Sequence, residues 1–265
     1  MKPAATRSIW MPRSRPAARI RLLCFPYAGA GANVYRGWDR ELGDDVELAA
    51  VQLPGREWRR NEQPFTRLDD LIDHLLPEVS AWFEDSRPGM FFGYSMGGAI
   101  GFVLAQRLHQ AGARGPAALF AAACRAPKRL AATGALFRLG DEDFVEAIRR
   151  LGGMPDTVAV EPALVQLVLP TLRADFEVLG THSWQPSEPV PCPLYVYGGS
   201  NDQLASRSEI AQWREHTSGR FQIRLFSGGH FFINDARGQL LKTLAADLAL
   251  VPIEHAAARD TLAAS

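Results

Sequence analysis

The sequence predicts one α/β domain built on a mostly parallel sheet, and two features of the chain indicate this. Short apolar runs alternate with segments of helical periodicity, which is the pattern of parallel strands joined by crossover helices. The length of 265 residues is also normal for a single α/β domain with a sizeable core. We therefore expect helices on both faces of the sheet and functional loops at its carboxyl edge.

Six apolar runs, each bounded by turn residues, are the expected strands. They cover residues 19–27, 46–53, 89–94, 116–123, 192–199 and 221–229. Helical periodicity fills the intervals at residues 33–42, 65–83, 97–112, 208–217 and 235–250.

The long interval from Arg125 to Pro191 needs structure of its own, because unstructured loops of this length are rare in compact domains. Residues 141–153 and 162–179 have helical patterns. We expect a helical lid insertion at about 125–191, over the carboxyl edge of the sheet; a helix pair that only thickens the fold is the alternative. The apolar candidates to line a pocket under such a lid are Leu139, Phe144, Met154 and Phe176.

The two ends of the chain are expected to lie outside the domain of residues 19–251. Residues 1–18 are basic and proline-rich without an apolar stretch, which predicts a flexible arm rather than a signal peptide. Residues 252–265 are rich in alanine and are expected to form a flexible tail.

Composition narrows the class of partner and the compartment. Lysine plus arginine equal aspartate plus glutamate at 29 each, so no bulk charge attracts nucleic acid or an acidic membrane surface. Cys24, Cys124 and Cys192 lack metal-ligand spacing, and three cysteines cannot all pair within the chain, which favours a reducing, cytoplasmic compartment. No apolar run is long enough to span a bilayer, and no heptads predict a coiled coil, so we expect a monomer away from membranes.

The strongest chemical signal is Ser95, which lies in the run Gly93-Tyr94-Ser95-Met96-Gly97 between an expected strand and an expected helix. This is the G-x-S-x-G nucleophile elbow in its required context. The glycines let strand and helix approach closely while the serine is exposed at the tip of a strained turn. The alternative is a buried serine in a packing turn.

The oxyanion donors are expected on either side of this elbow. The Met96 backbone N–H, at the start of the following helix, is the first. The second should come from the loop "PYAGAGANVY" after the strand that ends at Phe25, with Ala28 as our candidate and Tyr27 as the alternative. That loop contains no G-x-G-x-x-G dinucleotide fingerprint, and we expect neither a cofactor nor a metal.

A catalytic serine needs a histidine as its base and an acid that orients the histidine. In this fold the chain order is serine, acid, histidine. His230 is the expected base, because it is the histidine that directly follows a strand, in "FSGGHFF". Asp202, in "SND" after the preceding strand, is the expected acid, although an aspartate there could instead cap a helix. Asp175, in the insertion, is the second candidate for the acid. These residues together predict a serine acyl hydrolase.

Five segments along the chain extend this hypothesis: "FPYAGAGANVY", "QLPGRE", "GYSMGG", "GGSND" and "GGHFF". Together they resemble the type II thioesterases of polyketide and nonribosomal peptide synthases, from about residue 20 to 250. The resemblance implies the α/β-hydrolase fold and hydrolysis of thioesters on the phosphopantetheine arm of an acyl or peptidyl carrier domain, which clears stalled or aberrant acyl groups. The arm would enter as part of the substrate.

The resemblance also assigns roles that agree with the residue argument. The family's nucleophile, acid and base fall on Ser95, Asp202 and His230, and its oxyanion donors fall on Ala28 and Met96. The run Gly29-Ala30-Gly31 departs from the paired glycines of many relatives.

Three other functions share these residues and stay open at this point. An esterase or lipase-like hydrolase of free esters would use the same triad, an acyltransferase or cyclase would replace water with another nucleophile, and a binding module would keep the scaffold without chemistry. A basic cluster that could meet an acidic carrier domain, or be merely solvated, is formed by Arg125, Lys128 and Arg129.

Overall fold

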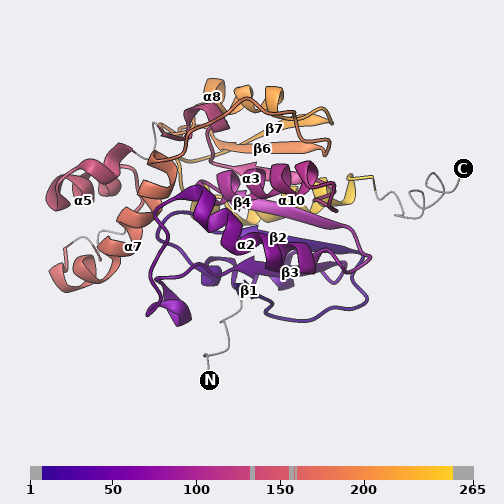
Figure 1. The fold of residues 1–265 in the computed structure, drawn as a ribbon, viewed down its shortest axis with the longest axis horizontal. Helices are drawn as coiled ribbons and strands as arrows, with labels where there is room; N and C mark the ends of the chain where they lie inside the picture. Colours follow the sequence, from indigo (N-terminus) through magenta and orange to yellow (C-terminus); the bar gives the residue numbers. More distant parts are fainter. Residues whose placement is uncertain (1–7, 132–134, 155–157, 159, 253–265) are drawn as a thin grey trace, which may run out of the picture.

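The computed structural model describes residues 8–131, 135–154, 158 and 160–252. Within these residues the strands form one seven-stranded sheet in the order β1-β3-β2-β4-β5-β6-β7 (Figure 1). Every neighbouring pair is parallel except β1 with β3. The expected mostly parallel α/β sheet is therefore confirmed. Its strands are β1 Ile9–Trp10, β2 Ile20–Phe25, β3 Val46–Val51, β4 Gly89–Tyr94, β5 Leu119–Ala122, β6 Leu194–Gly199 and β7 Phe221–Phe226.

Helices connect the strands. The α-helices are α1 Trp38–Glu41, α2 Leu68–Trp82, α3 Met96–Gln110, α5 Asp141–Arg150, α7 Pro162–Gly180, α8 Arg207–Ala211, α9 Phe232–Asp235 and α10 Arg237–Ala249, and 3₁₀ turns are η1 Ala32–Tyr35, η2 Glu57–Arg59, η3 Pro127–Arg129, η4 Ala135–Arg138 and η5 Gln212–His216. The helix expected at 33–42 is wrong in one respect: it is split into η1 and α1. Gly37, with φ of 84°, turns the chain between the two pieces.

The sheet is covered on both faces because successive residues of each central strand enter different cores. On β2, Leu23 belongs to the core that includes Leu71 of α2 and Ile100 of α3. The adjacent residue Leu22 belongs to the core on the opposite face of the sheet, with Trp38 of α1 and Leu244 of α10. This two-sided burial fixes the plane of the sheet and leaves its carboxyl edge for the loops that carry the site.

The segment between β5 and β6 contains the expected helices. Helices α5 and α7 lie beyond one end of the sheet (Figure 1) and share a small apolar core of their own. In it the Phe144 and Phe176 rings meet edge to face with centroids 5.5 Å apart. Met154 is buried in the same cluster. Leu139 is 38 % exposed, so it is wrong as a pocket-lining residue.

The expected flexible arm is wrong for residues 8–18. Ile9 and Trp10 form β1, which pairs with Val51 and Ala50 of β3. Ser8 is fully buried, and its N–H and Oγ–H both donate to the Glu78 carboxylate of α2, at 2.8 Å each. Residues 1–7, and the tail expected at 252–265 except Pro252, lie outside the described residues.

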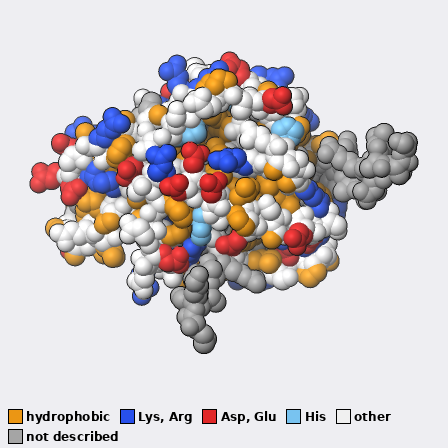
Figure 2. Space-filling model, in the orientation of Figure 1, with side chains coloured by type: hydrophobic (Ala, Val, Ile, Leu, Met, Phe, Trp, Pro, Cys, Tyr) orange, Lys and Arg blue, Asp and Glu red, His pale blue; other side chains and the backbone are white. Residues whose placement is uncertain are grey.

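The surface agrees with the balanced composition. Acidic and basic side chains are interspersed on the face shown in Figure 2, and neither sign dominates that face. In the described part of the chain, no helix is both long enough and apolar enough to cross a membrane.

Candidate active site

Ser95 stands at a sharp turn between β4 and α3. Its φ of 51° and ψ of −115° are strained for a residue with a side chain. The neighbouring glycines make the turn possible: a Cβ on Gly93 would lie 2.2 Å from the Gly97 carbonyl oxygen, and one on Gly97 would lie 2.0 Å from the Phe25 carbonyl oxygen. The expected elbow is thus present, and its glycines are required by close backbone approach.

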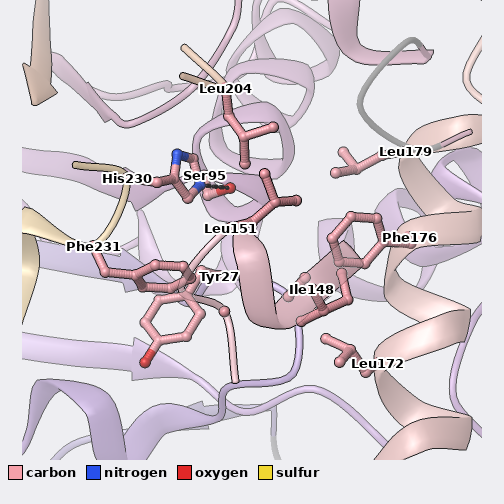
Figure 3. Close-up of a pocket in the computed structure, with 12 residues that line it drawn as sticks. Tyr27, Ser95, Ile148, Leu151, Leu172, Phe176, Leu179, Leu204, His230 and Phe231 are labelled. Atoms are coloured by element: carbon pink, nitrogen blue, oxygen red, sulfur yellow. Dashed lines mark hydrogen bonds between the residues drawn. The ribbon is translucent and has the colours of Figure 1, made fainter. Parts of the chain in front are cut away.

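The structure brings Ser95, His230 and Asp202 into one hydrogen-bonded line. Ser95 Oγ lies 3.0 Å from His230 Nε2 (Figure 3), and His230 Nδ1 lies 2.9 Å from Asp202 Oδ2. The three residues come from the ends of β4, β7 and β6, which are at the carboxyl edge of the sheet. Ser95 is half-buried, so its hydroxyl is accessible to a substrate while the acid behind it is covered.

Asp202 faces the base and does not cap a helix, because α8 begins after Ser206, which is the N-cap of that helix. Its Oδ2 faces His230, while its Oδ1 accepts the N–H groups of Leu204 and Ala205 at 2.8 and 3.0 Å. Burial alone would raise its pKa, but the hydrogen bond and charge of His230, with the two N–H donors, outweigh this and lower the pKa below the ordinary value. The carboxylate therefore stays ionised beside the imidazole.

Tyr94 is a functional residue that the sequence reasoning missed. Its hydroxyl donates to the His230 carbonyl oxygen at 2.6 Å and accepts the Ile233 N–H at 3.2 Å. The residue before the nucleophile therefore holds the loop that carries the base. The signal was the tyrosine inside the elbow motif, but nothing local indicated a partner 136 residues away.

The structure places both expected oxyanion donors at the site, and their role stays a prediction. Met96 begins α3, so its N–H lies at the positive end of that helix. Ala28 lies beside Ser95 in the lining of the same pocket. Neither N–H donates to an acceptor within the described residues, which leaves both for a ligand oxygen. Tyr27, the alternative donor, also lines the pocket; its carbonyl accepts the Ala30 N–H at 3.0 Å and its ring packs edge to face on Phe231, but neither contact uses the Tyr27 N–H, so this alternative stays open.

Asp175 is wrong as the second candidate for the acid. It lies on α7, where its carboxylate makes a two-pronged ion pair with Arg56 at 2.5 and 2.8 Å. The same carboxylate accepts the Gly29 N–H at 2.7 Å. The histidine has its partner in Asp202, and Asp175 contacts the loop on the other side of the nucleophile.

An apolar pocket opens at Ser95 and His230 (Figure 3), with about 420 Å³ of space when its open mouth is included. Of the four lid residues expected to line it, Phe176 does, whereas Phe144 and Met154 pack inside the lid. The other residues around it are Tyr27, Ala28, Ile148, Leu151, Gly153, Leu172, Leu179, Leu204 and Phe231. Ile148 comes from α5, Leu151 and Gly153 follow that helix, and Leu172, Phe176 and Leu179 come from α7, so the insertion forms one wall of the site.

Two of the three residues in the basic cluster at the start of the insertion are paired with acidic side chains of the same chain. Arg125 lies 3.0 Å from the carboxylate of Glu209, and Lys128 lies 2.6 Å from that of Glu215. These pairs weaken the expectation that the cluster meets an acidic partner.

Comparison with known proteins identifies the family. The model of the thioesterase domain family matches residues 20–248. The chain belongs to the thioesterase domain family. This thioesterase is 37 % identical to thioesterase PikA5 of Streptomyces venezuelae over 229 residues, which cover 86 % of this chain and 81 % of that protein.

Solved structures agree. The RedJ thioesterase from the prodiginine biosynthetic pathway of Streptomyces coelicolor superposes with a TM-score of 0.83 at 34 % identity, covering 93 % of this chain and 91 % of that one. The type II thioesterase BorB from the borrelidin biosynthetic cluster gives 0.81 at 34 % identity, covering 92 % and 99 %. The resemblance to type II thioesterases is confirmed, as is the α/β-hydrolase fold, and the chain is a thioester hydrolase.

Proposed function

We propose that this thioesterase releases acyl groups from the phosphopantetheine arm of acyl or peptidyl carrier domains in a polyketide or nonribosomal peptide pathway. The catalytic groups would be Ser95, His230 and Asp202, with the N–H groups of Ala28 and Met96 as the oxyanion hole. The observation that carries the proposal is the hydrogen-bonded line from Ser95 through His230 to Asp202 at the mouth of an apolar pocket. The RedJ and BorB thioesterases, which are named for the prodiginine biosynthetic pathway and the borrelidin biosynthetic cluster, support the class of substrate.

Acylation would begin with removal of the hydroxyl proton. His230 Nε2 accepts the proton of Ser95 as Oγ attacks the thioester carbonyl carbon, and Asp202 stabilises the imidazolium. The carbonyl oxygen becomes an oxyanion that accepts the N–H groups of Ala28 and Met96. Collapse of this intermediate breaks the C–S bond, and the imidazolium returns the proton to the pantetheine sulfur, which leaves as the thiol.

Deacylation would repeat these steps with water. His230 removes a proton from a water molecule, whose oxygen attacks the acyl-serine carbonyl, and the Ser95 Oγ–C bond breaks as the imidazolium protonates Oγ. The free acid leaves and the serine is restored. No step requires a metal or a cofactor.

The test compares carrier-bound thioesters with matched oxygen esters. Acyl-loaded carrier protein incubated with the wild type should lose its acyl group as the free acid, detected by intact-mass spectrometry, and Ser95→Ala should leave it loaded. Oxygen esters of the same acyl group should react much more slowly. Equal rates on the oxygen esters would favour a general esterase, and an acylated amine or a cyclic product would favour acyl transfer.

We also infer that the thioesterase acts in the cytoplasm as a monomer. Cys24, Cys124 and Cys192 are free and buried, as suits a reducing compartment. Sedimentation analysis of the purified chain would test its oligomeric state.

A further inference from the structure

The loop that carries the second oxyanion donor is held in one specific turn. The Ala30 N–H donates to the Tyr27 carbonyl oxygen at 3.0 Å, which closes a four-residue turn. Its third residue, Gly29, has a φ of 81°, as a type II turn requires at that position. The turn's own hydrogen bond does not use the N–H groups of Ala28 and Gly29. An acceptor outside the turn can therefore bind these N–H groups and hold the turn in place.

Asp175, on helix α7 of the lid, binds this turn. One carboxylate oxygen, Oδ2, accepts both the Gly29 N–H at 2.7 Å and Arg56 Nη1 at 2.5 Å, and Oδ1 accepts Arg56 Nη2 at 2.8 Å. Arg56 is itself fixed to backbone, through Nε to the Pro54 carbonyl at 3.1 Å. Asp175 and Arg56 are only 3 % and 7 % exposed, so water competes little for these bonds.

Two further contacts bind the same helix to the same region. Thr171 Oγ–H of α7 donates to the Gly55 carbonyl at 2.7 Å. Leu172 packs so closely on Gly29 that a Cβ there would lie 2.9 Å from its side chain. Helix α7 and the oxyanion loop are therefore in direct contact, and a displacement of the helix would alter the turn next to Ala28.

A buried ion pair is a poor source of stability, because desolvation offsets most of the attraction between its charges. Two apolar side chains could fill the same space. The carboxylate instead contributes a defined orientation. The two hydrogen bonds from Arg56 fix the plane of the Asp175 carboxylate, and the carboxylate in turn fixes the orientation of the Gly29 N–H. Ala28, whose N–H is the proposed oxyanion donor, directly precedes Gly29 in the chain.

We propose that Asp175, oriented by Arg56, is a positioning residue that holds the oxyanion loop in its active form from the lid helix. The same helix lines the acyl pocket through Leu172 and Phe176 and anchors the loop through Asp175, so a displacement of α7 would change the pocket and the oxyanion loop together. The proposal rests on the proposed Ser95 chemistry and is independent of the carrier domain.

The main test is Asp175→Asn, measured with a small acyl-N-acetylcysteamine thioester so that carrier recognition is not involved. The amide removes the negative charge opposite Arg56 and leaves one carbonyl oxygen for the bonds that two carboxylate oxygens now accept from Arg56 and the Gly29 N–H. We expect kcat to fall roughly 10- to 100-fold, a fraction of the loss for a missing oxyanion donor, with KM changed by about twofold or less. A trifluoromethyl ketone, which forms a tetrahedral adduct with the serine, should lose affinity by the same factor as kcat/KM.

Two further variants separate positioning from folding. Asp141→Asn removes another carboxylate paired with α7, that of the Arg173–Asp141 ion pair at 2.7 Å, without touching the loop, and should keep wild-type kcat. The double variant Arg56→Met/Asp175→Leu removes both charges together, so its thermal midpoint should recover toward wild type while kcat stays low. Recovery of kcat together with stability would overturn the proposal, as would an Asp175→Asn enzyme that binds the ketone as tightly as wild type. Failure of the proposed function would instead be seen in the wild type, as an absence of ketone adduct at Ser95.

Discussion

The two carboxylate oxygens of Asp202 have different partners: Oδ2 faces His230, and Oδ1 accepts two backbone N–H groups. Substitutions of Asp202 can therefore separate its effect on catalysis from its effect on stability. Asp202→Asn keeps an oxygen for the N–H groups of Leu204 and Ala205 but presents an amide N–H to His230 Nδ1. That favours the tautomer with the proton on Nε2, which cannot accept the serine proton. We expect kcat to fall on the order of 10⁴-fold with little change in the free energy of unfolding.

Asp202→Ala should match this loss of kcat and also lower the free energy of unfolding by about 1 kcal/mol, because the N–H groups of Leu204 and Ala205 lose their hydrogen-bond acceptor. Steady-state kinetics and urea unfolding of both variants check the pair. An Asp202→Asn enzyme within roughly tenfold of the wild-type kcat would exclude Asp202 as the partner of the base.

Tyr94 makes a second residue-scale prediction. Tyr94→Phe removes the hydroxyl that holds the His230 carbonyl and the Ile233 N–H, so the histidine loop loses its anchor to the elbow. We expect kcat to fall about tenfold and the free energy of unfolding to drop by about 1–3 kcal/mol. Tyr195→Phe is the matched control, since the buried Tyr195 hydroxyl has no hydrogen-bond partner in the described residues. Equal kcat for both variants would contradict the positioning role of Tyr94.

At the scale of elements, α5 and α7 should set the acyl preference. Leu151, at the end of α5, projects into the pocket near Ser95 (Figure 3) and is only half-buried, so its truncation costs little stability. Leu151→Ala should raise the ratio of kcat/KM for hexanoyl over acetyl thioesters by roughly tenfold, because the pocket gains room for methylene groups. Leu139→Ala, on the exposed side of the lid, should leave the ratio unchanged. The same ratio in both variants would show that the lid does not select the acyl chain.

The elements themselves were largely predictable, because their signals are local. Apolar runs gave the strands β2 to β7 in the right order, and Ser95 was recognisable from the strand, glycines and helix around it. The signal failed where elements are short or broken. Strand β1 has only two residues, and Gly37 divides a segment whose apolar spacing alone predicted one helix.

Contacts that join distant parts of the molecule could not be predicted. Ser8 is ordered because Glu78, 70 residues away, accepts its N–H and hydroxyl, and no local pattern records that pairing. Asp175 was expected near the site but in the wrong role, since its true partners, Gly29 and Arg56, are 146 and 119 residues distant. The sequence identified chemically suitable side chains, and tertiary packing decided which of them met.

The whole molecule should lose stability in acid partly through His216. Burial among aromatic rings, and then the nearby Lys128 charge, lower the pKa of His216 from 6.5 to about 4. Below about pH 6.5 the unfolded chain therefore binds a proton at His216 that the folded chain does not bind. The free energy of unfolding decreases as the pH is lowered from about 6.5 to about 4, and below that the contribution of His216 no longer changes. The full effect is about 3 kcal/mol at most.

His216→Gln should lack this component. Urea unfolding at about pH 7.5 and about pH 4.5 should show a smaller acid loss for the variant than for the wild type. Parallel losses in the two proteins would mean that His216 titrates alike in the folded and unfolded chain.

The central claim is that Ser95 becomes acylated by the thioester, and rapid-quench mass spectrometry of the enzyme tests it most directly. Mixing the wild type with an acyl-loaded carrier protein and quenching within the first turnover should add the mass of the acyl group to the peptide that contains Ser95. His230→Ala should show no such adduct in the same time. An acyl group found on another residue, or turnover that proceeds while Ser95 stays unmodified at every quench time, would contradict the account.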